Sequence, residues 1–257
     1  MKKLLLLTFM VLATLVSHAQ MIYDFNKNEL VDNPQKRVLL KSIAAAGEIY
    51  LKSGETIEGN LSVPEIKLFE KGNISVVCYP SKEKRTILAD DIKMIRLYST
   101  SQTKANTLIY SNYQLVKMTG NKKEMMEKSD LSELEIKTKK QKCWMLQECK
   151  GKANLYSIGA GYAFNSDGFL IPFVKGTKES IPTVLYCGQM EGRDETPILI
   201  HINSGGTNIG SNVFFRMTAP AFFGEHQISE KIRNKEDGYY KNIDIEYLFE
   251  KYNESFK

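Results

Sequence analysis

Only a few residues of this sequence have the types and the spacing that enzymatic chemistry requires. Cys187 and His201 lie on the two arms of a predicted β-hairpin, and a cysteine beside a histidine can form a nucleophilic pair. If Cys187 faces Leu199 across the hairpin, His201 is a diagonal neighbour on the same face, about 7 to 8 Å away. A register shift of one residue places the two side chains on opposite faces. Because the sequence offers no orienting residue and no oxyanion donor, we favour packing within the sheet over catalysis.

Other familiar catalytic patterns are absent from the sequence. His201 and His226 are the histidines that follow the leader described below, and neither belongs to a zinc motif. The glycine-rich run 204–210 lacks the Lys-Ser/Thr end of a phosphate-binding loop, and Gly159-Ala160-Gly161 lacks the third glycine of a dinucleotide fingerprint. Adjacent acids such as Asp90 and Asp91 point to opposite faces if they lie on a strand. We therefore expect no metal and no cofactor, and we interpret the glycines as a connection and a turn.

The elements that would position these residues are mostly β-strands. Asn33-Pro34 before the run 35–46, with Gly47 after it, is typical of a short helix with signals at both ends. Strands are predicted where apolar and polar residues alternate or where β-formers gather between turns. In the first part of the chain these are residues 48–52, 56–63, 73–79, 85–88 and 92–98, with Ser53-Gly54-Glu55 as a hairpin turn.

The middle of the chain is also β-rich, and its end is helical. Strands are predicted at 108–118, 142–149, 153–158, 169–174, 183–189 and 197–202. Turns are predicted at Lys150-Gly151-Lys152, Asn165-Ser166-Asp167-Gly168 and Glu191-Gly192-Arg193-Asp194. Residues 212–223 are apolar with Pro220 interrupting them, and helices are predicted at 225–234 and 243–252. The last helix has Ile245, Leu248, Phe249 and Tyr252 on one stripe, and Asn242 or Asp244 could cap it.

These patterns predict an α+β chain: a β-rich N-terminal and central region, made of a small barrel-like module and antiparallel hairpins, followed by a short helical C-terminus. The expected organisation is a signal peptide at 1–19, an N-terminal β module at 20–105 that can include a leading helix, an antiparallel β-rich region at 106–205 and a helical region at 206–257.

Two stretches resemble known families. The segment 51–61, Leu-Lys-Ser-Gly-Glu-Thr-Ile-Glu-Gly-Asn-Leu, resembles the strand-turn-strand opening of small Sm-like or SH3-like β-barrels, and 91–95 resembles their closing strand. Gly54 permits a tight turn and Gly59 permits a sharp bend of the strand. Because the glycine-bearing second RNA-binding motif of Sm proteins is missing, the resemblance implies a shape and not RNA binding.

The hairpin 144–156 and the ending from Phe222-Phe223 through Ile228 and Ile232 to Tyr252-Asn253 resemble segments of an uncharacterised family of exported Bacteroidota proteins. The resemblance implies export and carries no activity.

The first nineteen residues have the pattern of a cleavable signal peptide. Lys2 and Lys3 precede thirteen apolar or near-apolar residues, 4–16, and Ser17-His18-Ala19 supplies the small residues of a cleavage site. A bilayer span needs roughly twenty residues, and no later stretch approaches that length. We expect a mature chain that begins at Gln20, without a transmembrane segment, in the periplasm or secreted.

The charge of the mature chain argues against nucleic-acid binding. Without Lys2 and Lys3, 33 basic residues are balanced by 30 acidic ones, for a formal net charge of +3. Positive and negative side chains interleave, whereas nucleic-acid binders usually have a clustered basic face. We interpret the densest basic run, Lys137, Lys139, Lys140 and Lys142, as a solvated loop.

The four cysteines, Cys78, Cys143, Cys149 and Cys187, suit an oxidising compartment and allow three pairings. On one strand, Cys143 and Cys149 would be about 20 Å apart, which prevents a bond between them. We favour buried free thiols.

Three functions remain open from the sequence. The first is a non-enzymatic interaction protein that binds an envelope or extracellular protein, which exposed sheet edges favour. The second is an enzyme that uses Cys187 and His201, and the third is a small-ligand or glycan binder that uses the aromatic side chains.

Overall fold

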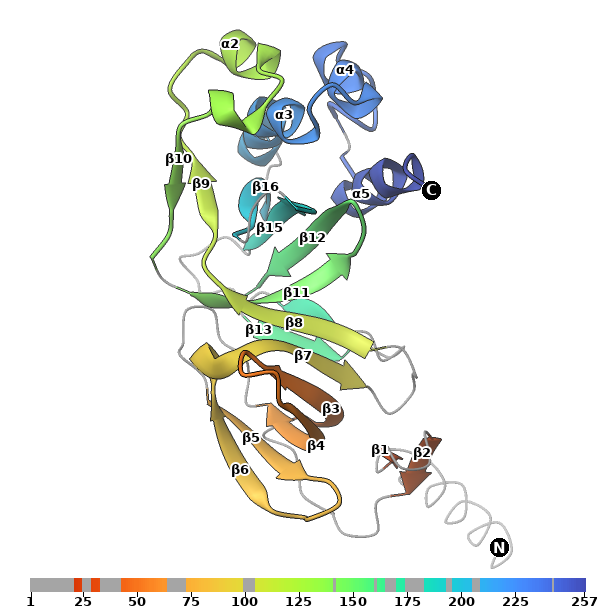
Figure 1. Ribbon diagram of the computed structural model, residues 1–257. Coiled ribbons are helices and arrows are strands. Elements are labelled where there is room, and N and C mark those ends of the chain that lie inside the picture. Colours follow the sequence, from red (N-terminus) through yellow and green to blue (C-terminus); the bar gives the residue numbers. More distant parts are fainter. Residues whose placement is uncertain are drawn as a thin grey trace, which may run out of the picture. The chain divides into compact units, whose positions relative to one another are not determined.

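The chain has the structure shown in Figure 1, a computed structural model. It describes residues 21–24, 29–32, 43–63, 73–98, 105–140, 142–159, 161–164, 170–173, 183–192, 196–204, 209–241 and 243–257. These residues form two compact units. Unit 1 takes its described residues from 1–65, 72–108 and 163–171, and unit 2 takes them from 109–162 and 172–257.

The prediction of a β-dominated α+β chain is confirmed. Twelve strands belong to a mostly antiparallel sheet, and the described helices are few and concentrated after residue 208. Two further pairs of short strands stand outside that sheet. They are β1 (Met21–Asp24) with β2 (Glu29–Asp32), and β13 (Gly161–Phe164) with β14 (Leu170–Phe173).

Unit 1 is an antiparallel group of strands in which most strands pair with a neighbour in sequence, while β7 returns to pair with β3, the first strand of the group. The strand order is β8-β7-β3-β4-β5-β6. The strands are β3 (Ile43–Leu51), β4 (Thr56–Val63), β5 (Asn73–Cys78), β6 (Lys84–Leu88), β7 (Ile92–Tyr98) and the start of β8 (Ala105–Ser111). One 3-10 turn, η2 (Ala89–Asp91), connects β6 to β7. Alternate residues such as Ile49, Leu61, Ile74 and Ile95 are buried and form the core.

Two glycines permit the close approach of strands in unit 1. Gly47 and Gly59 lie opposite each other in the β3–β4 register. A Cβ atom on Gly59 would lie 2.2 Å from the carbonyl oxygen of Val77, and one on Gly47 would lie 2.7 Å from the carbonyl oxygen of Arg96. Because both neighbours are backbone atoms, any other residue would push the strands apart.

The structure corrects two expectations for this part of the chain. The predicted helix at 35–46 is wrong for residues 43–46, which form the start of β3, and its remainder lies outside the described residues. The alanines of 44–46 pair with β4, so tertiary pairing overrides their helix propensity. Asp90 and Asp91 lie in the η2 turn and not on a strand, and both are exposed.

Unit 2 contains the second group of strands, in the order β10-β9-β16-β15-β12-β11. They are β9 (Gln114–Val116), β10 (Ile136–Thr138), β11 (Cys143–Cys149), β12 (Ala153–Ile158), β15 (Thr183–Met190) and β16 (Ile198–Ser204). All pairs are antiparallel except β16 with β9. The helical elements are α2 (Lys122–Glu127), the 3-10 turn η3 (Leu131–Glu133), α3 (Ile209–Phe223), α4 (Gln227–Arg233) and α5 (Ile245–Glu254).

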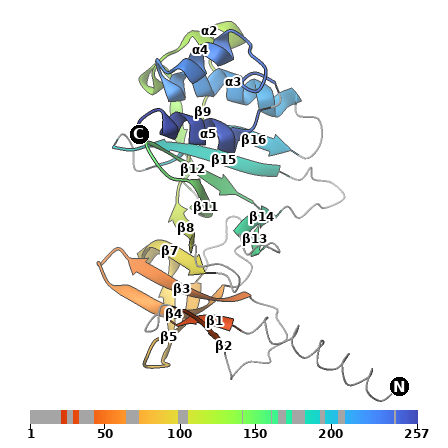
Figure 2. The ribbon, with the colours of Figure 1, turned by 90° about the vertical axis from the view of Figure 1, so that its right-hand side faces the viewer.

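Helices cover one face of this sheet, as Figure 2 shows for α3 and α5 above β12, β15 and β16. The largest buried cluster lies between them and includes Phe215, Phe222 and Phe249. A Cβ atom on Gly188 of β15 would lie 2.5 Å from the ring of Phe222 and 3.0 Å from that of Phe249, so this glycine lets both helices approach the sheet. A smaller cluster, which includes Cys143, Met145 and Cys187, fills the opposite face.

The helical end was largely predicted. The stripe of Ile245, Leu248, Phe249 and Tyr252 is buried, and Asp244 caps α5 by accepting a hydrogen bond from the Tyr247 N–H at 3.0 Å. Pro220, which was expected to interrupt the apolar run, does not break the helix. It lies inside α3, whose last residues Phe222 and Phe223 are buried against α5 before Gly224 ends the helix at a φ of +66°.

Candidate functional site

The two candidate catalytic residues lie on adjacent strands but point to opposite faces. Cys187 faces Leu199 in the β15–β16 register, as required for the Cys-His hypothesis. However, a β-bulge follows at once, and His201 faces Tyr186 instead. Cys187 belongs to the cluster around Cys143, whereas His201 contacts Tyr186 and Phe215 in the helix-covered core. The bulge, which adds one residue to β16, therefore separates the two side chains.

The thiols are not poised for nucleophilic attack. Cys187 and Cys143 are fully buried, and burial raises the pKa of both, to about 12 for Cys143. Since the thiolate is the nucleophile, a raised pKa keeps these groups protonated and inert at neutral pH. All four cysteines are free, with Cys149 half-buried and the other three buried.

His201 is held in its neutral form by its surroundings. Its side chain is 6% exposed, lies edge-on to Phe215 with ring centroids 5.7 Å apart, and packs on Tyr186 at 5.9 Å. Its Nδ1 atom has no hydrogen-bond partner among the described residues. Burial lowers its pKa from 6.5 to about 4. A histidine in this setting serves as a packed aromatic residue.

This burial makes the stability of the protein sensitive to acid. The unfolded chain binds a proton at His201 below about pH 6.5, whereas the folded chain does so near pH 4, so stability is lost as the pH falls between these values. In the wild type, His201 should lower the free energy of unfolding by up to about 3 kcal/mol at acid pH, and His201→Phe should abolish this decrease. Urea unfolding at pH 7.5, 6, 5 and 4.5 measures the free energy of unfolding. The value for the variant, relative to that for the wild type, should rise at each lower pH. The control Tyr186→Phe retains the histidine and should show the same pH dependence as the wild type. If the free energy of unfolding of His201→Phe depends on pH as that of the wild type does, burial of neutral His201 is not the cause of the acid sensitivity.

A polar row that sequence reasoning missed crosses the helix-covered face of the sheet. Ser157, Tyr186 and His201 lie side by side on β12, β15 and β16. The Ser157 hydroxyl donates a hydrogen bond to the carboxylate of Glu148 on β11. Burial raises the pKa of Glu148 to about 7, and the nearby Glu246 of α5 adds to the shift. Such a carboxyl group can exchange protons at neutral pH.

The row does not form a serine-histidine pair. Ser157 and His201 are separated by β15, which corresponds to two strand spacings of about 4.8 Å each. Ser157 is fully buried. A substrate could not reach its hydroxyl without displacement of the covering helices, so the row consists of packed polar side chains and is not a catalytic site. No local pattern in the sequence predicts this row, because it depends on the pairing of four strands.

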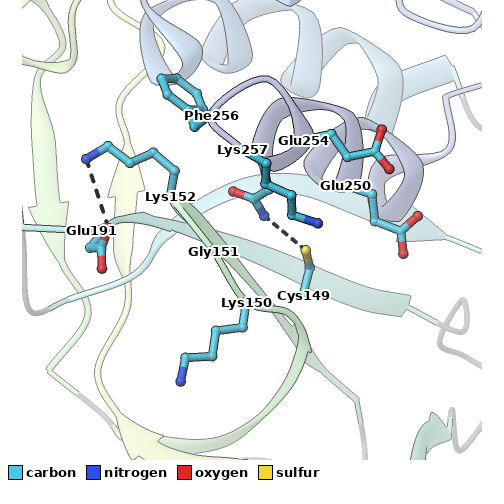
Figure 3. A pocket seen from close by; sticks show the side chains of 10 residues that line it. Cys149, Lys150, Gly151, Lys152, Glu191, Glu250, Glu254, Phe256 and Lys257 are labelled. Atoms are coloured by element: carbon cyan, nitrogen blue, oxygen red, sulfur yellow. Dashed lines mark hydrogen bonds and ion pairs between the residues drawn. The ribbon is translucent and has the colours of Figure 1, made fainter.

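A surface basin of about 560 Å³ lies where the β11–β12 hairpin meets the end of α5 (Figure 3). Asn253 is one of its lining residues: Oδ1 accepts from the Ala153 N–H at 2.8 Å, and Nδ2 donates to the Ala153 carbonyl at 2.9 Å and to Cys149 Sγ at 3.2 Å. Lys152 lies 4.0 Å from Glu191. Three lysines and three glutamates line the basin, so its charge favours neither anions nor cations. The lining charges are Lys150, Lys152, Lys257, Glu191, Glu250 and Glu254.

Among the strands that the structure describes, β6 is the last in the order of its sheet, and none of them pairs with its outer edge (Figure 1). The Cys78 N–H donates to the Glu83 carbonyl at 2.8 Å, and this bond sets the alternation of the antiparallel β5–β6 ladder. Arg85 and Ile87 therefore direct their backbone N–H and C=O groups toward β5. Lys84, Thr86 and Leu88 direct theirs outward, where no described strand pairs with them.

The side chains along this edge divide into two kinds. Ile87 is buried, and Arg85 forms an ion pair with Glu55 at 2.8 Å. Lys84, Thr86 and Leu88 are exposed, and Leu88 is 54% exposed although it is apolar. The edge thus combines outward backbone groups, a basic end and an apolar end.

The remaining predicted site segments can be placed only in part. Gly159 follows β12 and Gly161 begins β13, while Ala160 lies outside the described residues. Ser204 ends β16 and Ile209 begins α3, and 205–208 also lie outside. Within the described ranges, no group of three or more His, Cys, Asp and Glu residues could hold a metal ion. No helix in those ranges is both long and apolar enough to cross a membrane.

Comparisons with known protein families, with curated proteins and with solved structures found no match to this chain. The resemblances to small β-barrels and to exported Bacteroidota proteins therefore stay predictions.

Proposed function

We propose that this is an exported protein that acts without catalysis, by binding an extended segment of another envelope or extracellular protein along the outer edge of β6. The open edge of β6 is the observation that carries the proposal, because unpaired backbone groups on an edge strand are a template for a further strand. The leader pattern of residues 1–19 supports the compartment. The opposite orientations of Cys187 and His201 favour binding over the enzymatic alternative.

The side chains of β6 specify the chemistry of the partner segment. Cross-strand neighbours of opposite charge and apolar neighbours stabilise a strand pair. An acidic residue is expected opposite Lys84 and an apolar residue opposite Leu88, four positions along the same face. A β-branched residue suits the position opposite Thr86. The partner is thus an extended segment that is acidic at one end and apolar at the other.

Two proline variants test the backbone alternation that this proposal requires. Thr86→Pro removes an N–H that points away from β5 and should change the free energy of unfolding by less than about 1 kcal/mol. Arg85→Pro removes a ladder bond to β5 and should cost about 1 to 3 kcal/mol, because it leaves a carbonyl without its donor. Urea unfolding of both variants measures the difference. Equal losses would mean that the outer edge of β6 is not open.

Binding is tested in the cells that make the protein, with a photoreactive benzoylphenylalanine at position 88. We expect one crosslinked product of defined mass, and we expect Thr86→Pro in the same chain to abolish it. The matched control carries the photoreactive residue at position 58, which is exposed on β4 and away from the edge. A product that persists with Thr86→Pro, or no product at position 88, would refute the proposal.

Export is tested separately by N-terminal sequencing of the protein purified from the same cells. The expected terminus is Gln20. A protein that still begins at Met1 would contradict the assigned compartment.

A further inference from the structure

A single histidine joins the two C-terminal helices of unit 2. His226 is the N-cap residue of α4, and its Nδ1 atom accepts a hydrogen bond from the Ile228 N–H at 3.2 Å. Its Nε2 atom lies 3.0 Å from Oγ of Ser255, the residue that ends α5. The Ser255 hydroxyl in turn donates to the Tyr252 carbonyl at 2.6 Å. A continuous hydrogen-bonded chain thus runs from the start of α4 to the end of α5.

Only one form of the imidazole satisfies this chain. Because Nδ1 accepts from a backbone N–H, it carries no proton, and the proton of the neutral ring is on Nε2. Nε2 therefore donates to Ser255 Oγ. A second proton would have to occupy Nδ1, where it would face the Ile228 N–H and break the cap.

Two aromatic rings flank the same imidazole, which is partly exposed. The ring centroid of Tyr252 lies 4.7 Å from that of His226, and the Phe256 ring stacks on the imidazole at 6.2 Å. Tyr252 is buried and also contacts Phe223 of α3 at 5.1 Å. Phe256 is itself part of the wall of the basin in Figure 3. The protonation state of His226 is thus coupled to the position of the last turn of α5.

The charged groups of the packed elements do not offset a charge on His226. Burial is the cause that lowers its pKa below 6.5. Lys251 and Glu254 of α5 pair with each other at 2.8 Å. The other titratable groups of residues 225–233 and 250–257 are Glu225, Glu230, Lys231, Arg233, Glu250, Tyr252 and Lys257. The rings would attract an imidazolium, but loss of the cap and the positive end of α4 both act against it.

We propose that His226 is an acid-sensitive latch, which holds the last turn of α5 against the start of α4 while the imidazole is neutral and releases it when Nδ1 is protonated. Release breaks the Ile228 cap and frees Phe256, which opens the wall of the basin. The sign follows from the preference of the fold for the neutral ring: the latch is closed at neutral pH and opens as the pH falls through the lowered pKa of His226. This device is independent of the β6 edge.

The latch is tested by NMR hydrogen exchange on the full chain between pH 7.5 and 5, with protection factors corrected for the intrinsic rate at each pH. Protection of the Ile228 and Ser255 amides should fall about fivefold on protonation, which corresponds to loss of one N-cap. The imidazole signals of His226 should titrate over the same pH range as the loss of protection. Protection of the Leu248 amide, in the middle of α5, should stay constant.

Two variants keep the test decisive. His226→Asn supplies an uncharged cap, and its Ile228 protection should not depend on pH. Ser255→Ala retains the cap of α4 but removes the bond from His226 to residue 255, so at pH 7.5 the amide of residue 255 should exchange faster than in the wild type while that of Ile228 keeps its protection. Constant protection of Ile228 in the wild type, or the same pH dependence in His226→Asn, would overturn the proposal.

Discussion

Replacement of Phe249 by alanine is expected to lower the free energy of unfolding by about 3 to 5 kcal/mol, the largest effect of any substitution considered for this chain. Phe249 is fully buried on the inner face of α5. Its ring contacts Phe222 and Phe223 of α3, with centroids 5.6 and 5.3 Å away, and lies over Gly188 of β15. Because three elements meet at this ring, its loss leaves a cavity that no single element can fill.

The matched control for Phe249→Ala is Tyr247→Ala, two residues earlier on the same helix. Tyr247 is 48% exposed, so its removal should cost no more than about 0.5 kcal/mol. Urea unfolding at pH 7.5, followed by far-UV circular dichroism, measures both. Comparable losses for the two variants would show that α5 is not packed on the sheet through this face.

Gly59→Val is expected to destabilise unit 1 by about 3 kcal/mol or more, which exceeds the usual cost of overpacking. A Cβ atom at this position would lie 2.2 Å from the Val77 carbonyl oxygen and 2.8 Å from a methyl group of Val76. A carbonyl in a ladder cannot rotate away as a flexible side chain can, so β4 and β5 must separate. Amide exchange of β5 and β6, measured by NMR, should become faster than in the wild type.

The control for Gly59→Val introduces the same residue at the neighbouring position. Glu58 is exposed, and valine is a favourable strand residue, so Glu58→Val should leave exchange in β5 unchanged within error. If Gly59→Val behaves like Glu58→Val, the two strands are not in the close contact described for them.

Much of the architecture could be predicted because it depends on local signals. The turn at Lys150-Gly151-Lys152 joins β11 to β12, and the stripe from Ile245 to Tyr252 is buried as its spacing indicates. The helix predicted before residue 47 was wrong in its described part. There the alanines favour a helix locally, but pairing with β4 and β7 decides for a strand.

The arrangement of the candidate site could be predicted only in part. The pairing of Cys187 with Leu199 was one of the registers that the sequence left open, and the structure has it. The bulge beside it, which places His201 on the other face, has no signature in the residues around it. The Glu148 to His201 row and the link between His226 and Ser255 join residues that are distant in sequence, and only the tertiary fold brings them together.

The most direct test of the proposed function is amide hydrogen exchange at Thr86, in the free protein and in the complex recovered by crosslinking at position 88. In the free protein, Thr86 should exchange fast while Arg85 and Ile87 are protected by their bonds to β5. In the complex, Thr86 should become as protected as Ile87, because a partner strand supplies the missing acceptor. A Thr86 amide that is already protected in the free protein, or that still exchanges fast in the complex, would contradict strand addition at β6.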